Sequence, residues 1–413
     1  MMDVSRFKLD NGLRLVFFRD ESTEMVHVNL LYGVGAKNEE YSHTGLAHLL
    51  EHLMFEGTEK FPSFDEPLEE AGGDSNAYTN NDVTDYFISL PRRNAELAFC
   101  MESDRMRNAT LDDEKINVQR QVVMEEFKQH HLNKPYGDVS MLMRKLAFKK
   151  HPYRWSTIGR KLSHISDVPA EVVRDFHRRH YVPENAVLAV VGNVPFEQIK
   201  EWTIKWFGDI PATKCRKNEI PQEPRQRRQR RATVYRNVPN DALYMAFHMP
   251  GFNGADYYPC DVISDILANG YSGRLSERLV KKKKLFTRID AFISNTDHDG
   301  LFWIYSRLAD GVTYEQAEAA IRNELEQLQQ KEVSRAELEK VRNRFESEQI
   351  FSNLSGVNFA EKLALAEWYG DVTRAWREID MYRAVTPTDI KRVAKELFRQ
   401  GNSSVLLYKK AKK

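Results

Sequence analysis

Two histidines and a glutamate stand close together in the segment His48-Leu49-Leu50-Glu51-His52. Helical residues four positions apart lie on one face about one turn apart, so both imidazoles can reach the same metal ion. Zinc binds imidazole nitrogen readily, and a catalytic zinc site has three protein ligands with water in the open position. Glu51 is placed to take a proton from that zinc-bound water. The segment therefore predicts a hydrolytic zinc site with His48 and His52 as ligands and Glu51 as general base.

A third ligand has to come from elsewhere in the chain. The best local candidate is a helix predicted from Asn117 to Gln129, in which Glu125 and Glu126 are adjacent. Adjacent helical residues point about 100° apart, so only one of these carboxylates can face the metal. The spacing does not choose between them.

The elements that must position these residues follow from the apolar pattern. The motif lies in a predicted helix, residues 44–55, whose apolar side is formed by Leu46, Leu49, Leu50 and Leu53. A β-hairpin around Asp10-Asn11-Gly12 and a buried strand over 25–32 are predicted before it. Further strands are predicted at 76–79, 85–90, 186–191, 243–249 and 301–306, and helices at 93–107, 111–131, 137–147, 170–179, 256–268, 313–331, 335–352, 357–369 and 387–399.

The second half of the chain repeats the element types of the first. We therefore predict an α+β fold of two homologous α/β halves, each a mostly antiparallel sheet covered by helices. The expected domains are an N-terminal zinc-binding half at 1–195, a connecting segment at 196–230 and a C-terminal half without a metal motif at 231–413. The polar, arginine-rich stretch from Cys215 to Arg231 is interpreted as a solvated connection.

Composition excludes several classes of protein. The 61 basic and 60 acidic side chains leave a formal charge of +1, so bulk charge does not indicate a nucleic-acid partner. Three cysteines without close spacing favour neither a disulfide framework nor a thiolate zinc site. There is no apolar leader or membrane-length apolar run, so we expect no membrane association and a cytoplasmic location, or a periplasmic one if a leader has been removed.

The chain resembles a known family, the inverted-motif zinc peptidases of the pitrilysin and insulinase group. Within this family it resembles the short subunits related to mitochondrial processing peptidase. The resemblance extends over nearly the whole chain. The segments that carry it are Gly45 to Thr58, Asn76-Ala77-Tyr78-Thr79, Gln119 to Glu126 and Tyr181-Val182-Pro183-Glu184-Asn185. It implies one Zn²⁺ per chain and hydrolysis of internal peptide bonds in extended or unstructured peptides.

The resemblance also implies roles for individual residues. Glu126 would be the third zinc ligand, and Glu125 and Gln119 would lie behind the ligands. Family members usually have a glutamate where this chain has Gln119, so that charge is lost, although an amide can still hydrogen-bond to a ligand. Asn76, Ala77 and Tyr78 would bind the peptide substrate by strand pairing.

One departure from the family pattern concerns the second half. Complete active sites of the family use an arginine and a tyrosine seven residues apart, and the matching positions here are Val280 and Thr287. We therefore expect a heterodimer with a metal-free homologous subunit that carries the arginine and the tyrosine, with a homodimer as the alternative. The rival functional interpretation is a non-catalytic homologous subunit of a peptidase-like complex.

Overall fold

The computed structural model describes residues 3–215, 219–270 and 272–411. The chain forms two compact units, and neither is continuous in sequence. The first unit consists of Met1–Lys128, Trp155–Ile220 and Ile350–Arg377, and the second of Gln129–Arg154, Pro221–Gln349 and Glu378–Lys413. The predicted domain ranges, 1–195, 196–230 and 231–413, follow the order of the chain and do not include this exchange of segments.

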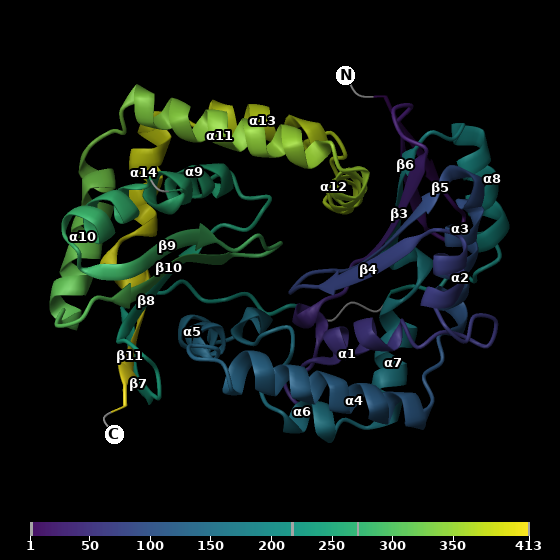
Figure 1. Cartoon of the computed structure of the whole chain (residues 1–413), viewed down its shortest axis with the longest axis horizontal. Helices are drawn as coiled ribbons and strands as arrows, with labels where there is room; N and C mark the ends of the chain where they lie inside the picture. The colour runs from purple at the N-terminus through teal and green to yellow at the C-terminus, as the bar shows by residue number, and fades with distance from the viewer. Residues whose placement is uncertain (1–2, 216–218, 271, 412–413) are drawn as a thin grey trace. The chain divides into compact units, whose positions relative to one another are not determined.

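The first unit is built on a six-stranded sheet with the order β1-β2-β6-β3-β5-β4. Its strands, drawn from purple to teal in Figure 1, are β1 (Val4–Lys8), β2 (Arg14–Arg19), β3 (Met25–Tyr32), β4 (Asp74–Thr79), β5 (Thr84–Pro91) and β6 (Ala186–Gly192). Only β2 and β6 run parallel, and the other neighbours pair antiparallel. β4 is an edge strand, and β5 is its only partner in this sheet.

The second unit is built on a five-stranded sheet with the order β7-β11-β8-β10-β9. Its strands are β7 (Arg230–Arg236), β8 (Ala242–Met249), β9 (Phe286–Ile293), β10 (Gly300–Leu308) and β11 (Ser403–Lys410). Only β7 and β11 run parallel, and β9 is the edge strand beside β10. Strand for strand, this is the topology of β2, β3, β4, β5 and β6. The predicted α+β duplication of mostly antiparallel halves is therefore confirmed.

Helices cover both faces of each sheet. Those within the first unit are α1 (Leu46–Leu53), α2 (Asp65–Glu70), α3 (Glu96–Asn108), α4 (Asp113–Phe127), α6 (Ser163–Ser166), α7 (Ala170–His180), α8 (Phe196–Phe207) and α12 (Gly356–Trp368). Those within the second unit are α5 (Val139–Ala147), α9 (Tyr257–Ala268), α10 (Tyr314–Gln330) and α14 (Pro387–Leu397), and α11 (Arg335–Asn353) and α13 (Arg374–Ala384) contain division points between the units.

The exchanged segments place one helix of each half on the other half's sheet. α12 follows the second sheet's β10 in the chain, yet it packs on β3 and β6 of the first unit. α5 follows β5, yet it packs on β11, β8 and β7 of the second unit. Because each sheet obtains part of its apolar cover from the other half of the chain, neither half has a complete core as a continuous segment.

Several elements lie outside the sequence prediction. They are α2, α6, α8, α13, β7, β9 and β11. In the predicted connecting segment, residues 196–207 form α8 and Gln226 is buried, donating a hydrogen bond to the Ser403 carbonyl at 2.8 Å. The expectation of a solvated connection concerned Cys215 to Arg231, and among the described residues of that stretch it is wrong for Gln226, while residues 216–218 lie outside the described part. Among the described residues, no helix is long and apolar enough to span a membrane.

Candidate metal centre

Helix α1 presents the two histidines because its opposite side is anchored in the core. Leu46, Leu49, Leu50 and Leu53 are at most 3% exposed. Gly45 precedes the helix with φ of 96°, in the left-handed region, and a Cβ there would lie 2.9 Å from the Ile158 carbonyl oxygen. The apolar side therefore determines how α1 is rotated about its axis, and this leaves His48 and His52 on the more open side.

The start of α1 is capped from outside the helix. The Glu39 carboxylate accepts hydrogen bonds from the Gly45 and Ala47 backbone N–H groups at 2.9 and 3.0 Å. These N–H groups have no partner within the helix, so the Glu39 side-chain oxygens satisfy donors that would otherwise be unpaired. Glu39 thereby holds the first turn of the helix that carries His48.

Helix α4 turns Glu126 toward α1. Asp112 caps α4 by accepting a hydrogen bond from the Lys115 N–H at 2.8 Å. Val123 and Phe127 are buried in the core. Since these two positions occupy the core side, the carboxylate of Glu126 emerges beside the α1 histidines, whereas Glu125 pairs with Lys128 at 2.6 Å on the exposed side.

The structure brings His48, His52 and Glu126 together. Glu126 Oε2 lies 3.7 Å from His48 Nε2 and 3.5 Å from His52 Nε2. Ligands of a tetrahedral zinc, each about 2.0–2.1 Å from the ion, lie about 3.3 Å apart, so these separations fit. In the described part of the chain, this is the only group of three or more such side chains close enough to hold a metal ion. Two imidazoles and a carboxylate also suit zinc chemically.

Glu51 lies beside the ligands with a largely buried carboxyl group. Burial raises its pKa, while hydrogen bonds from the side chain and backbone of Thr79 oppose that rise. Its Oε2 is buried without a hydrogen-bond partner among the described residues. A carboxylate so placed is available to receive a proton from a molecule beside the metal ligands.

The structure places the other predicted residues as follows. Gln119 Nε2 donates a hydrogen bond to Glu56 Oε1 at 2.5 Å. Glu126 is the main cause that raises the pKa of His52, and the nearby Gln119 side chain adds to that rise. Glu125 is turned away from the ligand group, as its pairing with Lys128 shows. Of the two, Gln119 lies on the side of α4 that faces the end of α1, and Glu125 does not.

The predicted substrate strand is the edge strand β4. Asn76 Oδ1 accepts a hydrogen bond from the Ala77 N–H at 2.8 Å. The Tyr78 hydroxyl donates to Glu361 Oε1 of α12 at 2.8 Å, so this side chain is turned toward α12. The backbone edge of β4, more than the Tyr78 side chain, is available to an extended peptide.

Comparisons with known proteins identify the family and agree with this fold. The family model described as "Insulinase (Peptidase family M16)" matches residues 14–161, and the model described as "Peptidase M16 inactive domain" matches residues 167–345. The chain is 30% identical over 414 residues to zinc protease PqqE of Helicobacter pylori, which covers 97% of this chain and 91% of that protein. The chain belongs to peptidase family M16. This family membership confirms the resemblance on which the zinc assignment partly rests.

Further relatives support the M16 assignment over most of the chain. It is 24% identical to a probable mitochondrial-processing peptidase subunit beta of Arabidopsis thaliana over 357 residues, 82% of this chain and 65% of that protein. A crystal structure of a protease from Helicobacter pylori has a TM-score of 0.92 and 28% identity, covering 99% of this chain and all of that one. A structure titled as a peptidase M16 inactive domain from Pseudomonas fluorescens, 15% identical, shares the fold with a TM-score of 0.89.

Some residues of this M16 site lie outside the sequence prediction. Thr79, at the end of β4, hydrogen-bonds to Glu51, and Glu39 caps α1. Glu56, just beyond α1, accepts from both Gln119 and Lys115. Of these three residues, only Thr79 could have been suggested by the sequence, because it follows Tyr78 in the predicted substrate strand.

Proposed function

We propose that this M16 family member is a zinc metalloendopeptidase that hydrolyses internal bonds of extended or unstructured peptides. The observation that carries the proposal is the convergence of His48, His52 and Glu126 beside the buried carboxyl group of Glu51. One zinc ion per chain is the expected cofactor, and a zinc ion held there would polarise the scissile carbonyl and make an attacking water more acidic.

The residues of the chain have the following roles in this proposal. Glu51 accepts a proton from the attacking water and later donates it to the nitrogen of the leaving amine. Its largely buried position suits a group that must both accept and donate a proton, because burial raises the pKa of the carboxyl group. The hydrogen bonds from Thr79 hold the carboxyl group in place between the two transfers. No covalent intermediate is required.

The substrate is expected to add a strand to β4. An edge strand presents unpaired N–H and C=O groups, and a peptide in extended conformation can pair with them. Main-chain pairing depends little on side chains, so the proposal includes broad sequence tolerance. Asn76, Ala77 and Tyr78 would contribute backbone groups, since the Tyr78 hydroxyl is engaged with Glu361.

A partner subunit is part of the proposal. At the positions where complete sites of this kind have arginine and tyrosine, Val280 packs against the core of the second unit and Thr287 lies in β9. Nearby arginines have other partners, since Arg274 forms two hydrogen bonds with Glu337 and Arg278 pairs with Glu324 at 2.7 Å. We therefore propose a heterodimer with a homologous subunit that supplies both residues, and a homodimer as the alternative.

A non-catalytic subunit of a peptidase-like complex is the second candidate function. The family model that matches residues 167–345 describes an inactive domain, and the arginine and tyrosine pair is absent from the chain at positions 280 and 287. The intact metal-ligand group favours the catalytic alternative. Zinc content and peptide turnover separate the two candidates.

The test of the proposed function compares two glutamine variants in the zinc-loaded protein, with the partner subunit present. Glu51→Gln is expected to retain zinc and to lower turnover by a factor of about 100 to 10,000, because general acid and base catalysis contributes about that much. Glu125→Gln makes the same change on the exposed side of α4 and is expected to retain both properties. Turnover near the unsubstituted rate in zinc-loaded Glu51→Gln would refute the assigned role.

A further inference from the structure

The predicted substrate strand β4 is hydrogen-bonded to a helix from the other half of the chain. The Tyr78 hydroxyl of β4 donates to Glu361 Oε1 of α12 at 2.8 Å. The two residues are 283 positions apart in the sequence, and both belong to the first unit. A residue of the C-terminal half thus contacts the strand that, in the proposed function, pairs with the peptide.

α12 is packed closely on the first sheet at both of its ends. At its start, a Cβ on Gly356 would lie 2.2 Å from His27 Cδ2 of β3, so a glycine allows this close approach. At its end, Trp368 lies against Gly33, where a Cβ would be 1.8 Å from Trp368 Cη2. Because both ends are fixed against β3 in this way, α12 presents Glu361 from a constant position.

Tyr78 is packed as well as hydrogen-bonded. Its side chain is partly buried against the apolar cluster formed by the first sheet and α12. Its partner in register on β5, Asp85, is fully buried and accepts a hydrogen bond from Asn29 Nδ2 at 2.8 Å. Burial, Asp85 and Glu361 all raise the pKa of the Tyr78 hydroxyl. The hydroxyl therefore stays protonated and acts as a donor to Glu361.

The end of β4 beside the general base is held by other bonds. Thr79, which lies next to Glu51, forms the last pair of the β4–β5 ladder with Thr84. Thr79 Oγ1 also donates to Thr84 Oγ1 at 3.3 Å. Loss of the hydrogen bond between Tyr78 and Glu361 is therefore expected to affect the orientation of the β4 edge more than the position of Glu51.

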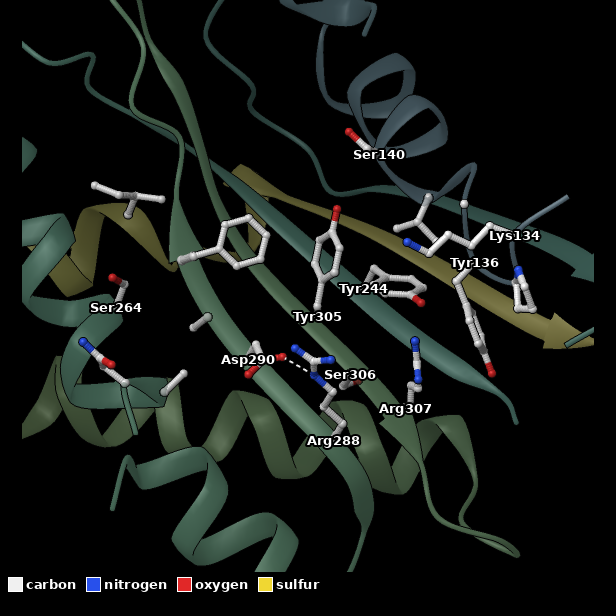
Figure 2. A pocket seen from close by; sticks show the side chains of 18 of the residues that line it. Lys134, Tyr136, Ser140, Tyr244, Ser264, Arg288, Asp290, Tyr305, Ser306 and Arg307 are labelled. Atoms are coloured by element: carbon white, nitrogen blue, oxygen red, sulfur yellow. Dashed lines mark hydrogen bonds and ion pairs between the residues drawn. The ribbon is translucent and has the colours of Figure 1, made fainter. Parts of the chain in front are cut away.

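The second unit has no such bridge at the corresponding place. By strand order β9 is the counterpart of β4, and α5 covers its sheet as α12 covers the first. A cavity of about 930 Å³ is lined by Ser140 of α5 and by Arg288 and Asp290 of β9, so it separates this strand from the helix. Figure 2 shows Ser140 on one side of the cavity and the ion pair of Arg288 and Asp290 on the other.

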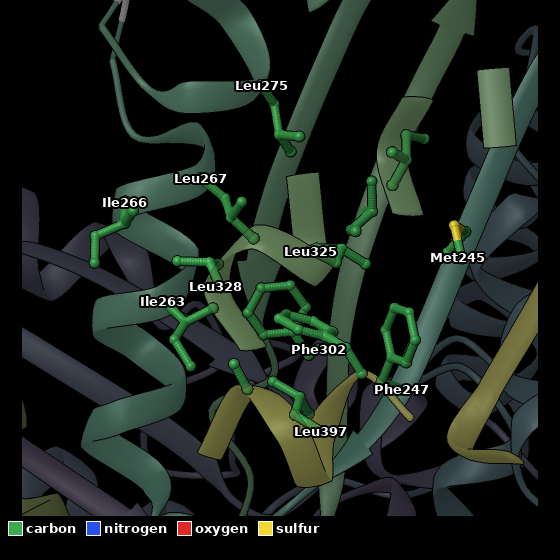
Figure 3. Packing of buried hydrophobic residues seen from close by; sticks show 14 of the residues in the cluster. Met245, Phe247, Ile263, Ile266, Leu267, Leu275, Phe302, Leu325, Leu328 and Leu397 are labelled. Carbon is green, nitrogen blue, oxygen red and sulfur yellow. The ribbon is translucent and has the colours of Figure 1, made fainter. Parts of the chain in front are cut away.

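β9 is held by the apolar core on the opposite face of its sheet. Phe286 and Ile289 of β9 belong to the apolar cluster of the second unit. Figure 3 shows part of this cluster, including Ile263 of α9, Leu328 of α10 and Phe302 of β10. Packing on one face is thus sufficient for an edge strand at this place in the fold. The bond from β4 to α12 therefore indicates a role besides folding.

We propose that Glu361 is a positioning residue for substrate binding, which acts through Tyr78 to keep the edge of β4 in the orientation that pairs with an extended peptide. This inference rests on the proposed function. A pairing strand uses its N–H and C=O groups together, so a change in its orientation weakens several main-chain hydrogen bonds at once. Because these bonds are made in both the bound substrate and the transition state, their weakening should raise Kd and KM and leave kcat nearly unchanged.

The test measures peptide binding without turnover, in full-length, zinc-loaded protein carrying Glu51→Gln. One unstructured synthetic peptide is titrated by calorimetry into this background and into the same background with Tyr78→Phe, with Glu361→Ala and with both changes. Each single change removes the same hydrogen bond and is expected to weaken binding about fivefold. The double variant is expected to lose about the same factor, whereas independent effects would multiply to about 25-fold.

Two further variants separate the hydrogen bond from the charge and from the helix. Glu361→Gln keeps an oxygen that can accept from Tyr78, so it is expected to restore the affinity lost in Glu361→Ala. Asn358→Ala, at an exposed position of α12, is the control and is expected to leave affinity unchanged. In protein with Glu51 intact and the partner subunit present, Glu361→Ala is expected to raise KM about fivefold with little change in kcat.

Several outcomes would overturn the role of Glu361. They are equal peptide affinity in all of these proteins, including no affinity in any of them, a double variant that binds about 25-fold more weakly, and a loss in Glu361→Gln as large as in Glu361→Ala. A fall in kcat at unchanged KM would do the same. Because binding is measured without cleavage, none of the binding outcomes affects the proposed hydrolytic role of Glu51, which zinc content and turnover test separately.

Discussion

At the scale of single residues, Gln119 links α4 to the residue just beyond α1. It donates a hydrogen bond to Glu56 at 2.5 Å, and it lies near enough to His52 to add to the rise of that histidine's pKa. Groups behind metal ligands orient them, and their loss typically weakens metal binding about 10-fold to 100-fold. Gln119→Ala is therefore expected to weaken zinc binding by about tenfold, measured by competition with a chelator. Gln121→Ala, on the exposed side of the same helix, is the control, and equal zinc affinity of the two variants would contradict the role of Gln119.

The sequence alone predicts two of the three metal ligands but does not choose the third. His48, Glu51 and His52 lie within one helix, so their spacing alone predicts that they share a face. The choice between Glu125 and Glu126 depends on how α4 is rotated, and that rotation results from burial of Val123 and Phe127 against other elements. Long-range packing of this kind cannot be predicted from the spacing of two adjacent glutamates, so the resemblance to the family was needed to choose.

At the scale of elements, α1 depends on the buried cap formed by Glu39. Burial raises the pKa of Glu39 to about 8, although its backbone hydrogen bonds oppose this. The folded state then holds a proton that the unfolded chain, with a pKa near 4.5, releases as pH rises. The stability contributed by this proton is complete below about pH 4.5 and is lost as pH rises to about 8. In metal-free protein, Glu39→Gln is expected to make the unfolding free energy fall less steeply between these pH values.

Urea unfolding at several pH values between about 5 and 8 measures this slope. Glu40→Gln is a matched control, because Glu40 is the exposed neighbour of Glu39. Its slope is expected to equal that of the unsubstituted chain. Other buried carboxyl groups contribute equally to all three proteins and cancel in the comparison. Identical slopes for Glu39→Gln and Glu40→Gln would show that Glu39 is ionised in the folded state.

Two of the strands that the sequence did not predict, β7 and β9, are edge strands. β7 reads Arg-Arg-Ala-Thr-Val-Tyr-Arg, and as an edge strand it keeps many charged residues that make it resemble a solvated linker. β9 is also an edge strand, and it directly follows a run of lysines. By contrast β3 and β6, in the interior of their sheet, are nearly continuous apolar runs, and the predicted ranges match them closely. Charged edge strands such as β7 are thus harder to recognise from apolar periodicity than β3 and β6, although the interior strand β11 also lies outside the prediction.

At the scale of the whole molecule, the two halves share a strand order but not a metal motif. Both halves have the same strand order and each places a helix on the other's sheet, so the difference concerns the side chains of corresponding helices. Where α1 has histidines, α9 has aspartates. At Val280 and Thr287, the resemblance to the family leads us to expect an arginine and a tyrosine in a complete site. The shared strand order shows that the two halves are a structural repeat. Residue identity between the halves is too low for the sequence alone to establish this repeat.

The missing pair leads to a prediction about assembly. Hydrolysis by this family requires a group that stabilises the negative charge developing on the carbonyl oxygen, and loss of such a donor typically lowers turnover by about 100-fold to 1,000-fold. Peptide cleavage by the purified, zinc-loaded chain is therefore expected to be slow, and a homologous subunit that carries the arginine and tyrosine is expected to raise it by about 100-fold or more. Mass spectrometry of the products measures both rates.

The same subunit with valine and threonine at those two positions, as in this chain at 280 and 287, is the matched control. Equally fast cleavage by the chain alone would instead mean that a second copy, or another residue of this chain, completes the site.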